Sequence, residues 1–130
     1  LSHTVTLNEE MSFVRSYIYL LQMRYEDNLD FDINIPQELL QRQVPPMAVQ
    51  MLVENAVKHN EISNRNPLTI HIYAERNGLC VSNRIQPKLS DSSSTCIGLA
   101  NLSKRYQLLF KQDITIEENE KIFKVTLPLI

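Results

Sequence analysis

Glycine and cysteine are scarce in this sequence, whose 130 residues include two of each: Gly78, Gly98, Cys80 and Cys96. With two glycines the chain cannot build a loop that wraps phosphate groups by close backbone approach in the usual way. The cysteines lack the CxxC or Cys/His spacing of a metal site, and their number argues against a disulfide framework. We therefore expect a reducing compartment, the cytoplasm.

An excess of charge is also absent, since the net charge is −2. This balance gives no reason to expect nucleic acid or an anionic membrane as a partner. No apolar run reaches the roughly 18 to 20 residues that a membrane-spanning helix needs, and no signal peptide is expected. The composition, 43% hydrophobic and 22% charged, is typical of a soluble domain with a real core. Because the first residue is Leu1 rather than Met, we expect a fragment of a longer protein.

Local patterns predict the first elements. Thr6 and Glu9 have the spacing of a capping box, and apolar residues then recur every three or four positions, which predicts a helix over 7–28. Alternation of apolar and polar residues predicts a half-buried strand over 29–36. A proline pair favours the start of a second helix, over 46–59, because proline in the first helical position loses no hydrogen bond.

The second half reads as hairpins and one more helix. Alternating strands over 68–75 and 79–83 flank Asn77-Gly78, a strong signal for a type I′ turn and an antiparallel pair. The remaining segments predict a polar loop over 84–96, a helix over 98–110 and a closing hairpin over 113–130 that turns at Asn119-Glu120. This order predicts an α/β (α+β) sandwich: a mixed, mostly antiparallel sheet with helices packed on one face.

The stretch MLVENAVKHN, residues 51–60, carries unusual polar groups on a strongly apolar helix. At 100° per residue, Asn55 and His59 lie at the border between the apolar and solvated arcs. Glu54 and Lys58 fall on the opposite, solvated side, where an i,i+4 pair gives modest support to a surface helix. Asn55 and His59 are therefore the candidates for facing a cleft beside the core.

Five segments together resemble a known family, the LytS-like sensor histidine kinases, whose catalytic domain belongs to the GHKL ATPase superfamily of gyrase and MutL. LVENAVKH (52–59) resembles the N box of that family, and VPPMAVQ (44–50) resembles the proline-led entry to its helix. IGLANLSKRYQLLF (97–110) looks like the glycine box with the helix after it, and VTLPLI (125–130) like the closing strand. The segment over 5–27 is similar to the one that joins the dimerisation helices to the catalytic domain.

The resemblance implies a site for ATP and Mg²⁺ beside the helix over 46–59. It implies that Asn55 contacts a Mg²⁺ ion bridging the phosphates, which suits an ion that takes one or two protein oxygens plus phosphate and water. It implies that Glu54 is catalytic, as base or orienter for the accepting histidine. The same resemblance assigns nucleotide contacts to Lys58 and His59, to the backbone at Gly98 and Asn101, and to Arg105, with a purely structural contact as the alternative for Arg105.

Several positions depart from the family pattern. Asn83 stands where the family has an aspartate that accepts a hydrogen bond from adenine, and both glycines of that motif are missing. An amide oxygen still accepts a hydrogen bond, although a weaker one than a carboxylate does. In the glycine box, Cys96 replaces the first glycine of the usual turn. His3, His59 and His71 do not lie in the phosphoacceptor motif of the family, so the accepting histidine is expected outside this chain.

These observations predict the cytoplasmic catalytic domain of a membrane-anchored sensor kinase, homodimeric in the intact protein. Residues 1–28 are expected to be the end of a dimerisation or joining region, and 29–130 the ATP-binding domain. The expected partners are ATP, the phosphoacceptor histidine and a response regulator. The alternative is a degenerate ATPase-like domain that contacts other signalling proteins without binding nucleotide. A non-kinase member of the superfamily is the second alternative.

Overall fold

The computed structural model describes residues 3–88 and 95–130, the second range with side chains from residue 98 onward. The serine-rich part of the predicted loop and the side chain at position 96 lie outside the described residues. The described elements follow the chain in this order: β1 (Val5–Thr6), α1 (Leu7–Tyr25), η1 (Glu26–Asn28), β2 (Leu29–Asn34), η2 (Gln37–Leu39), β3 (Gln43–Val44), α2 (Ala48–His59), β4 (Leu68–Glu75), β5 (Gly78–Arg84), α3 (Thr95–Phe110), β6 (Thr115–Glu118) and β7 (Ile122–Pro128).

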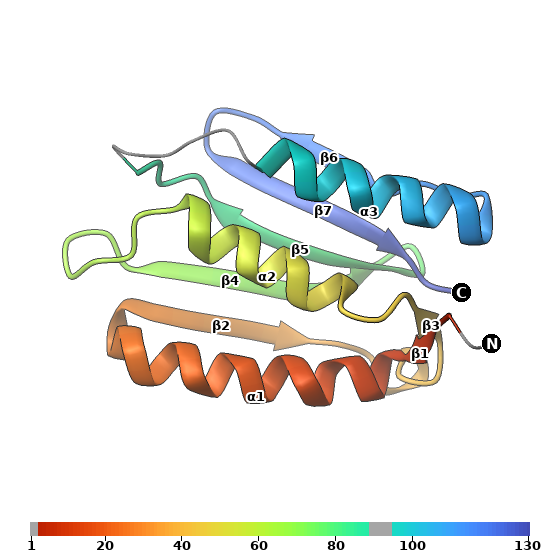
Figure 1. Cartoon of the computed structure of the whole chain (residues 1–130). Coiled ribbons are helices and arrows are strands. Elements are labelled where there is room, and N and C mark those ends of the chain that lie inside the picture. Colours follow the sequence, from red (N-terminus) through yellow and green to blue (C-terminus); the bar gives the residue numbers. More distant parts are fainter. Residues whose placement is uncertain (1–2, 89–94) are drawn as a thin grey trace.

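The main sheet has five strands in the order β2-β4-β5-β7-β6. The β2–β4 pair is parallel, and the other three neighbouring pairs are antiparallel. The helices α1, α2 and α3 lie side by side over one face of this sheet (Figure 1). The expected architecture, a mostly antiparallel sheet with helices on one face, is therefore confirmed.

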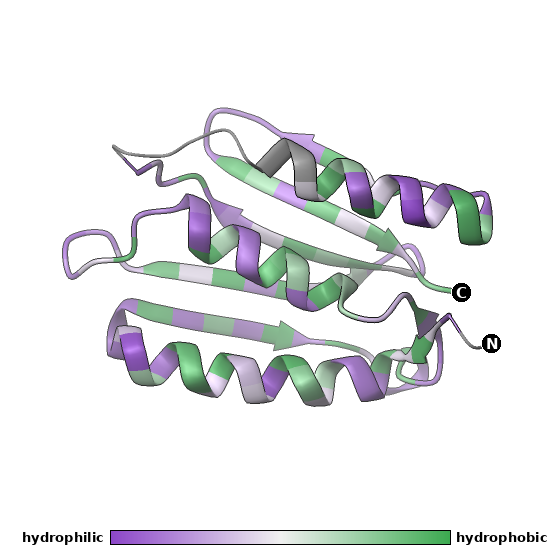
Figure 2. Ribbon diagram, in the orientation of Figure 1, coloured by the Kyte–Doolittle hydropathy of each residue, from purple (hydrophilic) through white to green (hydrophobic). Residues whose placement is uncertain are grey.

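The core fills the space between the helices and the sheet. Apolar residues alternate with polar ones along the strands and recur on the helices, as the hydropathy colours of Figure 2 show. Helix α1 begins as predicted: Thr6 Oγ1 accepts from the backbone N–H of Glu9, and Glu9 Oε1 accepts from that of Thr6, both at 3.1 Å. Val14 of α1 and Ile70 and Ile72 of β4 are fully buried in one cluster. Residues 1–28 and 29–130 thus contribute to the same core.

The β4–β5 hairpin forms as predicted, but its turn lies one residue earlier than expected. Arg76 and Asn77 occupy the two central positions, with φ of 53° and 65°, and Gly78 has no positive φ. Gly78 is instead required for space, because a Cβ there would lie 2.9 Å from Thr126 Cγ2 and 3.2 Å from the carbonyl oxygen of Leu127. The glycine therefore permits close approach of β7 rather than a left-handed backbone.

Helix α2 begins at Ala48 rather than at the proline pair, which precedes it in a turn. Met47, the residue before the helix, is left-handed with φ of 71°, and its own side chain makes no capping hydrogen bond. The capping acceptor comes from another element: the carboxylate of Glu10 on α1 accepts from the backbone N–H groups of Met47, Val49 and Gln50. Sequence spacing cannot reveal this cap, because the groups are about forty residues apart.

Cys80 is buried, but it lies outside the hydrophobic cluster between the helices and the sheet. Its Sγ lies 3.3 Å from Thr126 Oγ1 of the neighbouring strand β7. Burial raises the pKa of this thiol, which keeps it protonated at neutral pH.

Candidate functional site

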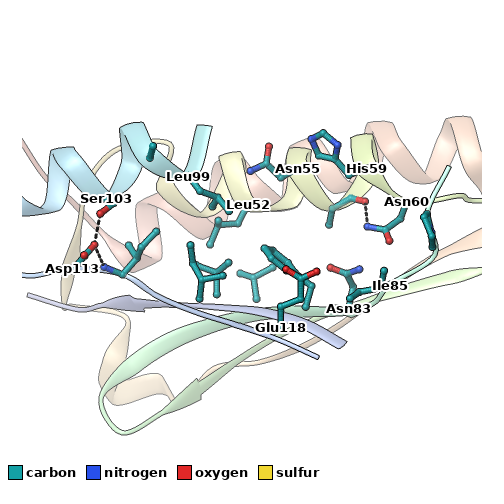
Figure 3. A pocket seen from close by; sticks show the side chains of 18 residues that line it. Leu52, Asn55, His59, Asn60, Asn83, Ile85, Leu99, Ser103, Asp113 and Glu118 are labelled. Carbon is teal, nitrogen blue, oxygen red and sulfur yellow. Dashed lines mark hydrogen bonds between the residues drawn. The ribbon is translucent and has the colours of Figure 1, made fainter. Parts of the chain in front are cut away.

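A cavity of about 670 Å³ lies between the helices α2 and α3 on one side and the strands β5, β6 and β7 on the other (Figure 3). This volume is in the range of small-molecule and cofactor sites. Most of the lining is apolar and comes from the sheet and both helices. Polar side chains enter it at separate points, and they are Asn55, His59, Asn60, Asn83, Ser103, Asp113 and Glu118.

Helix α2 supplies Asn55 and His59, one turn apart, to the cavity lining, as the border positions on the predicted helix require. Asn55 Nδ2 is buried and has no hydrogen-bond partner among the described residues. A buried donor without a partner is costly unless a ligand or solvent supplies an acceptor. Asn55 is therefore ready to donate a hydrogen bond to an oxygen-rich ligand in the cavity.

Asn83, near the end of β5, presents an acceptor to the same cavity. Its side chain is buried, and Nδ2 donates to the carbonyl oxygen of Arg84 at 2.6 Å. Because a carbonyl oxygen can only accept, this contact fixes the orientation of the amide, with Nδ2 toward Arg84 and the acceptor Oδ1 turned away from it. The side chain extends from the strand into the cavity in Figure 3. The site thus offers a neutral acceptor where a donor-bearing ligand can be recognised.

Asn60 is a residue that the sequence did not single out, and it fixes one wall of the cavity. Its Nδ2 donates to the carbonyl oxygen of Ala56, and its Oδ1 accepts from the backbone N–H of Gln86, both at 2.8 Å. Gln86 also donates through Nε2 to the carbonyl oxygen of Glu61 at 2.9 Å. These bonds fasten the chain after β5 to the end of α2, so Asn55, His59 and Asn83 are held in one rigid frame.

Ser103 and Asp113 form a second polar feature that the sequence did not indicate. Ser103 Oγ on α3 donates to Asp113 Oδ1, which also accepts from the backbone N–H of Ile114 at 2.8 Å. The serine bond, with the Ile114 amide in support, holds the pKa of the Asp113 carboxyl below its usual value. Both side chains line the cavity, and their pairing links α3 to the chain that leads into β6.

Other predicted site residues lie away from the cavity lining. Glu54 and Lys58 are exposed on the other side of α2, and Glu54 Oε1 accepts from Gln50 Nε2 at 3.4 Å. Burial, assisted by the Glu54 carboxylate, raises the pKa of Tyr17 on α1. Glu54 therefore faces toward α1 and solvent, rather than the space enclosed by α2, α3 and the sheet.

Helix α3 begins earlier than predicted, and this changes the positions of the three predicted site residues on it, Gly98, Asn101 and Arg105. Since α3 begins at Thr95, the backbone N–H of Gly98 is at the fourth helical position and that of Asn101 is in the interior, beyond the amides left free at the N-terminus. Gly98 nevertheless faces Asn55, whose Nδ2 and Oδ1 would both be 3.8 Å from a Cβ at this position. Asn101 is exposed, and Arg105 Nη2 donates to the carbonyl oxygen of Pro46 at 3.1 Å.

Within residues 3–88 and 95–130, no three or more His, Cys, Asp and Glu side chains gather so that they could hold a metal ion. In the same part of the chain, no helix is long and apolar enough to cross a membrane.

The sequence has clear relatives among characterised proteins. It is 31% identical, over an alignment of 132 residues, to the sensor histidine kinase/phosphatase LytS of Staphylococcus aureus strains Mu50 and N315. The alignment covers 88% of this chain and 23% of the relative, so the chain spans about a quarter of the length of the curated relatives it matches. No family model matches the sequence.

Solved structures show the same fold. The nucleotide-free catalytic domain of the histidine kinase ThkA aligns with a TM-score of 0.63 and 18% identity over 96% of this chain and 94% of that domain. The cytoplasmic segment of the histidine kinase QseC aligns with a TM-score of 0.60 and 13% identity, over 98% of this chain and 78% of that segment. The chain is thus homologous to the sensor histidine kinase LytS, and its fold is that of histidine kinase catalytic domains.

Proposed function

We propose that this chain is the ATP-binding catalytic domain of a two-component sensor histidine kinase. In the intact protein it would supply the γ-phosphoryl group of ATP to a histidine outside this chain. The phosphoryl group would then pass from that histidine to a response regulator. The observation that carries the proposal is the buried, unpartnered Nδ2 of Asn55 in a cavity that also holds an oriented acceptor, Asn83 Oδ1. Homology to a sensor histidine kinase supports the same assignment.

We assign the base of the nucleotide to the Asn83 side of the cavity. Val81, Ile85 and Val125 provide apolar surface there, which suits the faces of a purine ring. With Nδ2 turned toward the carbonyl oxygen of Arg84, Asn83 presents Oδ1 as an acceptor, which matches the exocyclic amino group of adenine. Guanine has a carbonyl oxygen at that position, which would leave two acceptors facing each other. The site is therefore expected to prefer adenine nucleotides.

We assign the phosphates and their Mg²⁺ ion to the Asn55 side. Asn55 Nδ2 can donate to a phosphate oxygen, and Oδ1 can serve as the single protein ligand that Mg²⁺ needs beside phosphate and water. His59, one turn along the same face, is positioned to contact the phosphates as well. Phosphoryl transfer of this kind depends on positioning and charge neutralisation, and both Asn55 and the bound metal would contribute to it.

Four predicted site residues do not line the cavity and could act only outside it: Glu54, Lys58, Asn101 and Arg105. Glu54 could orient the accepting histidine only if that residue approaches the exposed side of α2, since the carboxylate does not line the cavity. Contacts of Lys58, Asn101 or Arg105 with nucleotide would likewise need a ligand that extends beyond the cavity. We therefore rank Asn55, His59 and Asn83, with Gly98 beside Asn55, as the central residues of the proposed site.

Calorimetric titration of the domain with Mg-ADP, Mg-ATP and Mg-GDP tests the proposal. We expect adenine nucleotides to bind in the micromolar to low-millimolar range and GDP to bind at least about tenfold more weakly, a loss typical of one mismatched polar contact. Asn55→Ala and Asn83→Leu should each abolish detectable binding. Asn8→Ala, which removes an exposed helical asparagine on α1, is the matched control and should bind as the wild type does.

Absence of heat and of a thermal shift at millimolar nucleotide, in a folded sample, would contradict the proposal. The alternative function, a degenerate ATPase-like domain that contacts other proteins, would then account for the missing glycines and for the asparagine at position 83. Equal binding of ADP and GDP would leave nucleotide binding intact and refute the assignment of Asn83 to the base.

A further inference from the structure

We propose that Glu10 is a positioning residue that links helix α1 to the candidate site by fixing the N-terminus of α2. Glu10 is one of the few charged or polar side chains that are buried, with 3% of its surface exposed. It lies on α1, whereas its hydrogen-bond partners all lie at the start of the helix that carries Asn55 and His59. The part of the proposal that concerns ligand affinity rests on the proposed function.

Both carboxylate oxygens of Glu10 are used. Oε1 accepts from the backbone N–H of Met47 at 3.0 Å, and Oε2 accepts from those of Val49 at 3.0 Å and Gln50 at 3.2 Å. Ala48 is the one amide between Met47 and Gln50 that does not donate to Glu10, and its N–H donates to the carbonyl oxygen of Pro45. The carboxylate also lies at the positive end of the helix dipole, where a negative charge is favoured. Glu10 thus performs, from another helix, the role that an N-cap side chain normally has.

The turn that Glu10 holds is a constrained one. Met47 has a left-handed φ of 71°, a conformation that a side chain such as methionine rarely adopts and that persists where surrounding contacts enforce it. A second contact holds the same turn from the other side, because Arg105 of α3 donates to the carbonyl oxygen of Pro46 at 3.1 Å. All three helices therefore meet at residues 46–50, and Glu10 supplies most of the hydrogen bonds.

The position of this turn determines the position of the site residues on α2. Asn55 follows Val49 by six residues on one continuous α-helix, which transmits a shift or rotation of its first turn along its axis. The other end of α2 is fastened through Asn60 to the segment after β5. Glu10 therefore completes a clamp on α2, with Asn55 and His59 between the two fixed ends.

The experiment compares Glu10→Gln with Glu9→Gln in samples that are fully folded at the temperature used. Glutamine at position 10 replaces one acceptor oxygen by a donor, which faces backbone N–H groups and cannot bond to them. Glu9 is the adjacent, exposed carboxylate, and its side chain accepts from Thr6 in the cap of α1. The readouts are the side-chain amide resonances of Asn55, hydrogen exchange over residues 52–59, and the affinity for Mg-ADP.

In Glu10→Gln we expect shifted Asn55 resonances, faster exchange over 52–59 and an Mg-ADP affinity lowered at least about fivefold; Glu9→Gln should change none of these. Resonances and exchange of Glu10→Gln equal to those of Glu9→Gln would overturn the proposal, and Glu10 would then only add stability. If the wild type binds no ADP, the proposed function fails, but the resonance and exchange data still decide whether Glu10 positions Asn55.

A second variant covers the case in which Glu10→Gln does not fold. Glu10→Asp keeps the negative charge and shortens the side chain by one methylene, so it can reach fewer of the three amides. We expect an intermediate displacement of the Asn55 resonances in this variant. Unchanged resonances in a folded Glu10→Asp protein would also refute a positioning role, because the contact distances could not all be kept.

Discussion

Among single residues, Asp113 makes a contribution to stability that depends on pH. Its pKa is lowered from 3.8, chiefly by the hydrogen bond from Ser103. A carboxyl group with a lowered pKa in the folded state stabilises the fold fully above its unfolded pKa and loses this effect as the pH falls through the folded value. We expect Ser103→Ala to lower the free energy of unfolding at pH 7 and to have a smaller effect at pH 3.

Urea denaturation at both pH values measures this effect. Ser16→Ala is the control, because Ser16 Oγ bonds to the carbonyl oxygen of Ser12 in its own helix and to no titrating group in the part of the chain described. Its effect should be the same at pH 7 and pH 3. A pH-independent effect of Ser103→Ala would show that the serine acts through packing or local helix structure alone.

The two glycines are expected to respond oppositely to replacement by alanine. At Gly78 the new Cβ would meet Thr126 Cγ2 at 2.9 Å and a backbone oxygen at 3.2 Å, so we expect a loss of about 1–3 kcal/mol, as for other overpacked sites. At Gly98 the nearest atoms are at an ordinary 3.8 Å, and alanine in a helix is favoured over glycine by up to about 1 kcal/mol. Chemical denaturation of both variants measures the two changes in the free energy of unfolding. Equal decreases in Gly78→Ala and Gly98→Ala would contradict this account.

At the scale of elements, the turn between β4 and β5 can be improved. A type I′ turn needs positive φ at both central residues, here Arg76 and Asn77, and Asn-Gly is the sequence it prefers. We expect the double variant Arg76→Asn, Asn77→Gly to raise the free energy of unfolding by about 1 kcal/mol. Thermal denaturation measures the gain. Asn119→Gly, at the other hairpin, should destabilise, because Asn119 Oδ1 accepts from the backbone of Lys121 and Ile122.

The accuracy of sequence reasoning for these elements depends on how local their determinants are. The capping box at Thr6 and the β4–β5 pair follow from residues that are neighbours in the chain, and both are present. The start of α2 was wrong by two residues, because its cap comes from Glu10, about forty residues away. The start of α3 was wrong by three residues, since the helix begins at Thr95.

At the scale of the whole molecule, the order of the strands predicts which backbone hydrogen bonds open most rarely and therefore exchange most slowly. Strand β5 pairs on both sides, with β4 and with β7, and six of its seven residues are buried. Strand β6 is at an edge, and all four of its residues are exposed. Native-state hydrogen exchange should therefore be slowest in β5 and fast on the outer side of β6. Similar exchange in both strands would indicate that the sheet opens as one unit.

The candidate site shows the same limit of sequence reasoning. Asn55 and His59 could be placed by helical spacing, and the family resemblance identified Asn83. Asn60, Ser103 and Asp113 were missed because each contributes through a contact with a distant segment, which no spacing encodes. Helical spacing also placed Glu54 and Lys58 correctly on the exposed side of the helix, away from Asn55 of the same motif.

The single parallel pair in the sheet has a consequence for the time course of folding. Strand β2 pairs in register with β4, from Leu29 with Leu68 onward, so α2 and the long connections around it lie between the two partners in the chain. A hairpin such as β4–β5 closes a two-residue turn, whereas β2 has to close a loop of nearly forty residues before its first contact is gained. We therefore expect the later hairpins to assemble first and β2, with α1, to join last, so that β2 would lack its partner in the sheet until β4 has been synthesised.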